Sequence, residues 1–236
     1  MPTPPPAPDL SLGAKKILAL HGGGSSAHAL RNSAGFRDLQ DALGSDFAFV
    51  VPDADNGLWI QDSPGGKMYV TTNPNWADDS VALLDKVVEQ QGPFHGVLGF
   101  SQGAAFVPVY LAKTAATFQA VYLYCGYMPT VHQGLVDVIQ QHAPLMQVKI
   151  MVWMGAQDFI INNEYTHEFA RVLQASRVIV DANAGHALPV KDDATFSSTV
   201  QAYSDFSASS ATRTGAHHHL VVVAVLLVLT LTALGA

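Results

Sequence analysis

The sequence has few of the residues that mark disulfide-rich, metal-binding or nucleic-acid-binding proteins. Cys125 is its single cysteine, so no disulfide can form within the chain, and its apolar surroundings predict a small buried side chain. Lys and Arg number 12 against 19 Asp and Glu, which gives a net charge of −7. Without a basic stripe to neutralise phosphates, nucleic acid is not an expected partner. Cysteine and histidine show no zinc-ligand spacing, so we expect neither a metal nor a cofactor.

The two ends of the chain differ in composition from its middle. Residues 1–14 begin with five prolines in the first eight positions and lack the basic start and apolar core of a signal peptide, which predicts a disordered lead-in. Residues 207–219 form a polar spacer with three consecutive histidines, and residues 220–236 form an uncharged hydrophobic tail. The remaining segment, residues 15–206, is long enough to bury one substantial core and is expected to be a single domain.

The hydrophobic tail admits three interpretations. As a helix, its 17 residues would span ~25 Å, slightly less than the ~30 Å hydrocarbon core of a bilayer. It could be a tail anchor, a lipid-anchor signal preceded by the small residues 209–211, or a segment foreign to the folded domain. Because the chain shows no signal-peptide features, we expect a cytoplasmic protein. Either of the first two interpretations would add membrane attachment through the C-terminal tail.

A G-x-S-x-G pattern occupies residues 99–103, with Ser101 at its centre. A short apolar run precedes it and a longer apolar run, residues 104–112, follows it, which predicts a strand, a sharp turn and a helix. This arrangement is the nucleophile elbow of α/β-hydrolases, in which the turn exposes the serine hydroxyl and the backbone N–H of the next residue, Gln102, faces developing negative charge. The alternative is a glycine-rich turn whose serine caps the helix.

A second motif, His21-Gly22-Gly23-Gly24, directly follows a predicted strand at residues 15–20. In hydrolases of this plan the corresponding loop supplies the other oxyanion-hole N–H, which we assign to Gly23. The alternative is an ordinary glycine-rich loop. No phosphate-binding glycine pattern fits this segment.

Apolar periodicity predicts strands that alternate with helices along residues 15–206. This alternation indicates an α/β class, in the form of an α/β-hydrolase fold with a mostly parallel central sheet, helices on both faces, and a C-terminal tail helix added to it. The predicted strands are residues 15–20, 47–51, 95–98, 119–126, 148–154 and 177–181, and the predicted helices are residues 27–43, 79–91, 104–112, 132–142, 163–174 and 191–206.

A serine nucleophile needs a base and an acid that orients it. His186 alone among the ten histidines lies in a late loop after the last predicted strand, which makes it the candidate general base. Asp158 follows the strand at residues 148–154 and is the favoured acid. Asp181, only five residues before His186, is the rival. The order Ser101, Asp158, His186 is the order of hydrolase triads.

The segment from residue 53 to residue 75 is long and lacks periodicity, which is typical of functional loops. Trp59, within it, and Trp76, directly after it, are candidates to line an acyl pocket or to form a lid. The alternative is that these aromatic side chains fix the loop to the core.

Four stretches of the sequence together resemble the FSH family of serine hydrolases. They are Leu20–Gly24, the string G-P-F-H-G-V-L-G-F-S-Q-G-A-A at residues 92–105, Gly155–Asp158 and Gly185–Pro189. The resemblance covers residues 15–206 and implies an α/β-hydrolase fold with esterase or thioesterase activity. It implies the roles of nucleophile, acid and base for Ser101, Asp158 and His186. The chain departs from the family at His95, where an acidic residue is usual, and in its apolar tail.

From these features we expect a metal-independent serine hydrolase that acts on a small-molecule ester or thioester through an acyl-enzyme. The competing hypothesis is a non-enzymatic protein of the same fold, a receptor that holds its ligand.

Overall fold

The computed structural model describes residues 13–63, 66, 69–143 and 147–208. The expected lead-in falls largely outside this part of the chain, and the spacer from residue 209 onwards and the hydrophobic tail fall entirely outside it. Among the helices that are described, none combines the length and the hydrophobicity needed to cross a bilayer.

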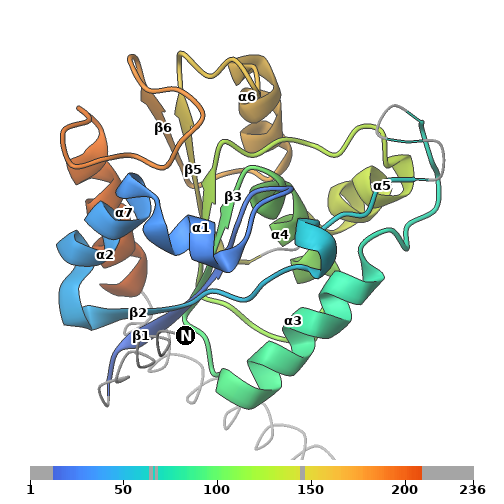
Figure 1. The fold of residues 1–236 in the computed structure, drawn as a ribbon, viewed down its shortest axis with the longest axis horizontal. Helices are drawn as coiled ribbons and strands as arrows, with labels where there is room; N and C mark the ends of the chain where they lie inside the picture. Colours follow the sequence, from blue (N-terminus) through green and yellow to red (C-terminus); the bar gives the residue numbers. More distant parts are fainter. Residues whose placement is uncertain (1–12, 64–65, 67–68, 144–146, 209–236) are drawn as a thin grey trace, which may run out of the picture.

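Six parallel strands form one sheet in the order β2-β1-β3-β4-β5-β6 (Figure 1). The expected strands are all present, with boundaries shifted by a few residues at most. Their bounds are β1 Lys15–Leu20, β2 Phe47–Val50, β3 Gly96–Phe100, β4 Ala120–Tyr124, β5 Lys149–Gly155 and β6 Arg177–Asp181. The central strand β4 is buried along its whole length, as expected for a parallel sheet covered on both faces.

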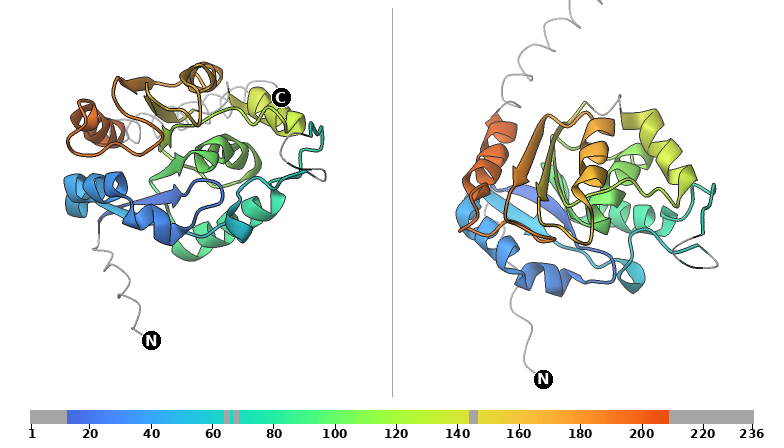
Figure 2. Two further views of the ribbon diagram at one scale, coloured as in Figure 1. Left: turned by 45° about the horizontal axis from the view of Figure 1, so that its top comes forward. Right: turned by 90° about the horizontal axis from the view of Figure 1, so that it is seen from above.

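Helices cover the two faces of the sheet as two separate layers (Figure 2). One layer contains α1 Ala27–Asn32, α2 Ala34–Leu43 and α7 Phe196–Ala208, and the other contains α3 Asp78–Gln91, α4 Gln102–Lys113, α5 Gln133–His142 and α6 Asn163–Val172. Two hydrophobic clusters result, one on each side of the sheet. The prediction of a mostly parallel sheet with helices on both faces is thereby confirmed for the described residues.

The order of the strands determines where the loops meet. The chain passes from β1 to one neighbour, β2, and later returns to the other neighbour, β3. Leu20 at the end of β1 pairs with Gly99 near the end of β3, so the loops after these strands leave the sheet side by side. Such a switch point at the carboxyl ends of parallel strands is where α/β proteins bind ligands.

Two helix predictions are wrong in detail. The single helix expected at residues 27–43 is two helices, because Ser33 adopts an extended backbone (ψ 143°) and its hydroxyl donates to the Leu30 carbonyl, which ends the first helix. The last helix begins at Phe196 rather than at residue 191. The intervening residues form turns, in which the Asp193 carboxylate accepts from Val190 N at 2.8 Å.

Gly35 in α2 packs against the backbone of the loop that carries His186. A Cβ atom at this position would come within 2.7 Å of the Leu188 carbonyl carbon. Gly35→Ala should therefore push the loop away and lower the free energy of unfolding by about 1–3 kcal/mol, the usual cost of overpacking. Urea denaturation would measure the change.

Gly185→Ala is the matched control, because its Cβ would meet its nearest neighbour, Gln157 O, at an ordinary van der Waals distance of 3.5 Å. Equal destabilisation by both substitutions would contradict the steric explanation.

Candidate active site

Ser101 occupies the turn between β3 and α4 in a strained backbone conformation. Its φ of 55° lies in the left-handed region, which non-glycine residues rarely adopt, and its side chain makes no capping hydrogen bond to α4. The alternative of a serine that merely caps the helix is therefore wrong. The flanking glycines allow close packing: a Cβ on Gly99 would lie 2.6 Å from Ala104 Cα, and one on Gly103 would lie 2.6 Å from His21 O.

The structure brings Ser101, His186 and Asp158 into one hydrogen-bonded chain. The Ser101 Oγ lies 2.9 Å from His186 Nε2, and His186 Nδ1 lies 2.7 Å from Asp158 Oδ2. With the imidazole proton on Nδ1, that nitrogen donates to the carboxylate while Nε2 accepts from the serine hydroxyl. This is the geometry that general-base activation of a serine requires.

The Asp158 carboxylate is fixed by the loop before α6. Its side chain is only 1 % exposed, and its Oδ1 accepts backbone N–H groups from Ile160 and Ile161 at 2.9 and 2.8 Å. These bonds leave Oδ2 directed at His186, whose side chain is 12 % exposed. A buried carboxylate that already accepts two backbone hydrogen bonds is suited to hold the imidazole in one orientation.

Asp181, the rival acid, holds the loop of His186 instead of contacting the ring. Its Oδ1 accepts from the backbone N–H groups of Asn183 and Ala184, and its Oδ2 accepts from the Thr195 hydroxyl at 2.9 Å. Burial opposes ionisation of this carboxyl, but these hydrogen bonds outweigh burial and lower its pKa.

Gly23 and Gln102 lie next to each other on the two loops that meet at the switch point. A Cβ on Gly23 would lie 3.1 Å from Gln102 Cβ, so Gly23 lies directly against the Gln102 side chain. Gln102 is the first residue of α4, where backbone N–H groups have no partner within the helix. Both residues therefore remain candidates to supply the N–H donors of an oxyanion hole.

The Gln102 side chain ties the loop after β2 to the site, a role that the sequence pattern did not reveal. Its Oε1 accepts from Trp59 N at 2.9 Å, and its Nε2 donates to Ile60 O at 3.2 Å. His21 adds a further link, because its Nε2 accepts from Ala54 N at 3.1 Å. Hydrogen bonds therefore connect the loop after β2 to both segments that carry the candidate oxyanion-hole residues, the loop after β1 and the start of α4.

Two cavities adjoin the serine and the histidine. Neither tryptophan expected at a pocket is among the residues that line them. Trp59 is completely buried, stacks on Phe106, and donates from Nε1 to His21 O at 2.8 Å. Trp76 donates to the Thr71 hydroxyl at 3.0 Å. Both contacts agree with the alternative, in which the aromatic side chains fix the loop, and the adjacent Leu58 and Ile60 line the larger cavity instead.

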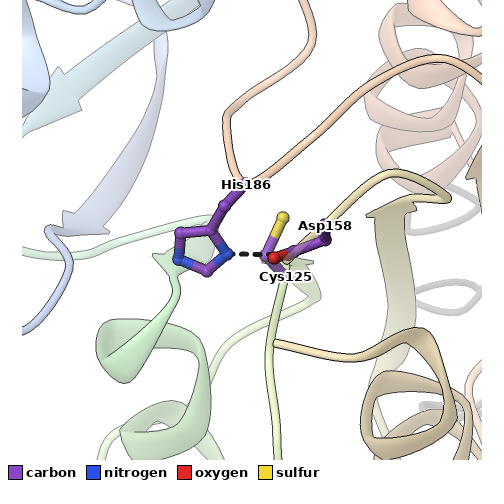
Figure 3. A group of neighbouring side chains, drawn as sticks. All are labelled: Cys125, Asp158 and His186. Atoms are coloured by element: carbon purple, nitrogen blue, oxygen red, sulfur yellow. Dashed lines mark hydrogen bonds and ion pairs between the residues drawn. The ribbon is translucent and has the colours of Figure 1, made fainter. Parts of the chain in front are cut away.

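Cys125 lies beside the carboxylate and the imidazole, which its apolar sequence context did not suggest (Figure 3). Its position directly after β4 was the available signal, since the other site residues also follow strands. One ligand atom from each of Cys125, Asp158 and His186 falls within 4.8 Å of the others. The Nδ1–Oδ2 separation of 2.7 Å is a hydrogen-bond length, shorter than the roughly 3.3 Å between two ligands of a tetrahedral zinc ion. This cluster therefore does not fit a zinc site.

Comparisons with known proteins identify the family of this chain and agree with its fold. The family described as "Serine hydrolase (FSH1)" matches residues 11–197. Esterase FUS5 of Gibberella moniliformis is 27 % identical over 208 residues, covering 76 % of this chain and 82 % of that protein. Among solved structures, esterase PE8 has a TM-score of 0.62 at 17 % identity, covering 84 % of this chain and 96 % of its own. Acyl-protein thioesterase 2 of Zea mays has a TM-score of 0.59 at 14 % identity, covering 86 % and 96 %.

The buried Cys125 thiol should be unreactive in the folded protein. Burial first, and then the neighbouring Asp158 carboxylate, raise its pKa to about 12. Since the thiolate is the reactive form, a disulfide exchange reagent at pH 8 should label the thiol only after denaturation. In the unfolded chain the pKa of the thiol is near its ordinary value of 9.0. The contribution of the thiol to the free energy of unfolding should therefore be lost as the pH rises from about 9 towards 12.

Rapid modification of the native protein at pH 8, at the rate seen in guanidinium chloride, would contradict this prediction. Cys125→Ser is its matched control, because that variant lacks the thiol and should show no labelling in either state.

Proposed function

Because the chain belongs to the serine hydrolase (FSH1) family, we propose that it cleaves a small-molecule acyl ester or thioester with Ser101 as nucleophile, His186 as general base and Asp158 as its orienting acid. The observation that carries this proposal is the continuous chain of hydrogen bonds from Ser101 Oγ through the imidazole to the Asp158 carboxylate. The strained backbone of Ser101 supports it, since strain of this kind is typical of functional sites.

The proposed reaction proceeds through two displacements at one carbonyl carbon. Ser101 Oγ attacks the carbon while His186 Nε2 takes the hydroxyl proton, and the carbonyl oxygen becomes an oxyanion that faces the backbone N–H groups of Gly23 and Gln102. The same Nε2 then gives its proton to the leaving oxygen or sulfur. Water, deprotonated by His186, attacks the acyl-enzyme and releases the acid and the free serine.

Asp158 stabilises the imidazolium that forms during both displacements. Because Asp158 Oδ1 is already occupied by two backbone N–H groups, only Oδ2 serves the histidine, and the ring is held in the tautomer that leaves Nε2 free to accept. The proposal assigns Asp181 a structural role, as the carboxylate that fixes the loop on which His186 lies.

Three substitutions test the proposed triad. Ser101→Ala should abolish covalent labelling by a fluorophosphonate probe, because the probe reacts with an activated serine. His186→Ala and Asp158→Asn should lower kcat on p-nitrophenyl butanoate by about 10³-fold or more, the scale of loss at comparable triads. Labelling followed on a gel and steady-state assays measure both effects.

Asp181→Asn is the matched control, since it alters a carboxyl five residues from His186 that does not contact the ring. It should lower thermal stability while the labelling of the folded fraction persists. If folded wild-type protein is not labelled, the serine is not activated and the ligand-receptor hypothesis takes precedence.

A matched pair of substrates decides between ester and thioester. Butanoyl esters and thioesters with the same leaving-group skeleton form the same acyl-enzyme, so deacylation is common to both and kcat/KM reports acylation. We expect hydrolysis of both, with loss of both activities in Ser101→Ala. Retention of either activity in that variant would contradict the single-site proposal.

A further inference from the structure

Two cavities extend from the candidate site in different directions. The smaller, of about 290 Å³, lies between the α1–α2 segment and the loop after β6, and its walls include Phe100, His186 and Leu188. The larger, of about 620 Å³, lies on the side of the loop after β2, and its walls include Ser101 and Gln102. His186 contributes to the first cavity only, whereas the nucleophile and Gln102 contribute to the second only.

The chemistry of acyl transfer assigns a substrate half to each cavity. The leaving atom must receive its proton from His186 Nε2, so the leaving group departs on the side of the imidazole. The acyl group stays bonded to Ser101 Oγ while its carbonyl oxygen faces Gly23 and Gln102, both of which line the larger cavity. The acyl chain therefore extends into the larger cavity, and the leaving group occupies the smaller one.

The two cavities differ in charge. Apart from His186, the smaller cavity is lined by neutral side chains, mostly apolar. The larger cavity contains one carboxylate, that of Asp62, which lies on an exposed position of its wall. Tyr127 lies nearby on the same wall, and burial together with the Asp62 charge raises the pKa of its hydroxyl. This wall therefore presents the Asp62 carboxylate and an uncharged phenol, together with the imidazole of His132, whose Nε2 lies 3.0 Å from Gln61 O.

We propose that Asp62 is a specificity-determining residue, which makes the larger cavity an acyl pocket that accepts neutral or cationic acyl groups and disfavours acyl groups ending in a carboxylate. The inference rests on the proposed function, because it takes Ser101 and His186 as nucleophile and base. A second carboxylate in this cavity would repel Asp62, whereas a hydroxyl or amine on the acyl chain would find an acceptor.

The test uses two pairs of substrates that differ in where a carboxylate is placed. The acyl pair is p-nitrophenyl hexanoate and the equal-length half ester of adipic acid with p-nitrophenol. The leaving-group pair is p-nitrophenyl hexanoate and 4-carboxyphenyl hexanoate. The readout is the ratio of kcat/KM for the uncharged substrate to that for the charged one, so that intrinsic reactivity cancels when variants are compared with wild type.

Asp62→Asn should lower the ratio for the acyl pair by about twofold to fivefold, the effect of a solvent-screened charge, and should leave the ratio for the leaving-group pair unchanged. Added salt should lower the wild-type ratio for the acyl pair in the same direction. The complementary variant is Ala29→Asp, which puts a carboxylate on the wall of the smaller cavity at an exposed position in the first turn of α1, where an acidic side chain is favourable. It should raise the ratio for the leaving-group pair only.

Each of the other possible results contradicts the cavity assignment, the role of Asp62 or the proposed function. If Asp62→Asn changes the leaving-group pair instead, the assignment of the two cavities is reversed. If it changes neither pair while wild type hydrolyses the uncharged ester, Asp62 does not determine specificity and the proposed function stands. If wild type hydrolyses no ester and takes no fluorophosphonate label, the proposed function itself has failed.

Discussion

The strained turn at Ser101 is the constraint on which the rest of the site depends. A serine held at φ 55° is stable only where the surrounding structure imposes that conformation, and here β3 and α4 do so from the two sides of the turn. Gly99 and Gly103 permit the approach of α4 and of the β1 loop, since any side chain there would collide with backbone. The hydroxyl is consequently directed away from the helix and towards His186.

The remaining parts of the site are positioned by backbone hydrogen bonds rather than by packing alone. Asp158 is held by two N–H groups of its own loop, and Asp181 holds the loop of His186 through two more and through Thr195. The two carboxylates thus have different partners: Asp158 bonds to the imidazole of His186, and Asp181 bonds to the backbone of the loop that carries it. Gln102 adds a third fixed point by joining the loop after β2 to the start of α4.

The segments that carry the three hydrogen-bonded residues differ in part from the segments that line the two cavities. This difference explains how the substrate preference of such a site can change. Ser101, Asp158 and His186 follow strands of the sheet. The walls of the two cavities come partly from the segments that carry these residues and otherwise mainly from the loop after β2, the α1–α2 segment and the segment between β4 and α5. Exposed positions in such loops tolerate change better than strand positions, because they make few core contacts. Substrate choice can therefore change while the arrangement of Ser101, Asp158 and His186 is kept.

The sequence by itself determined the class of fold, the order of the six strands along the chain and the candidates Ser101 and His186, with Asp158 favoured over Asp181, because apolar periodicity and glycine spacing are local signals. It did not determine which strands are neighbours or how Asp158 and Asp181 divide their roles, since both acids follow strands. Nor did it determine that Trp59 is buried while Leu58 and Ile60 line the cavity, or that Cys125 lies beside Asp158 and His186. Those outcomes depend on which loops meet at the carboxyl edge of the sheet, and long-range packing of the strands decides that.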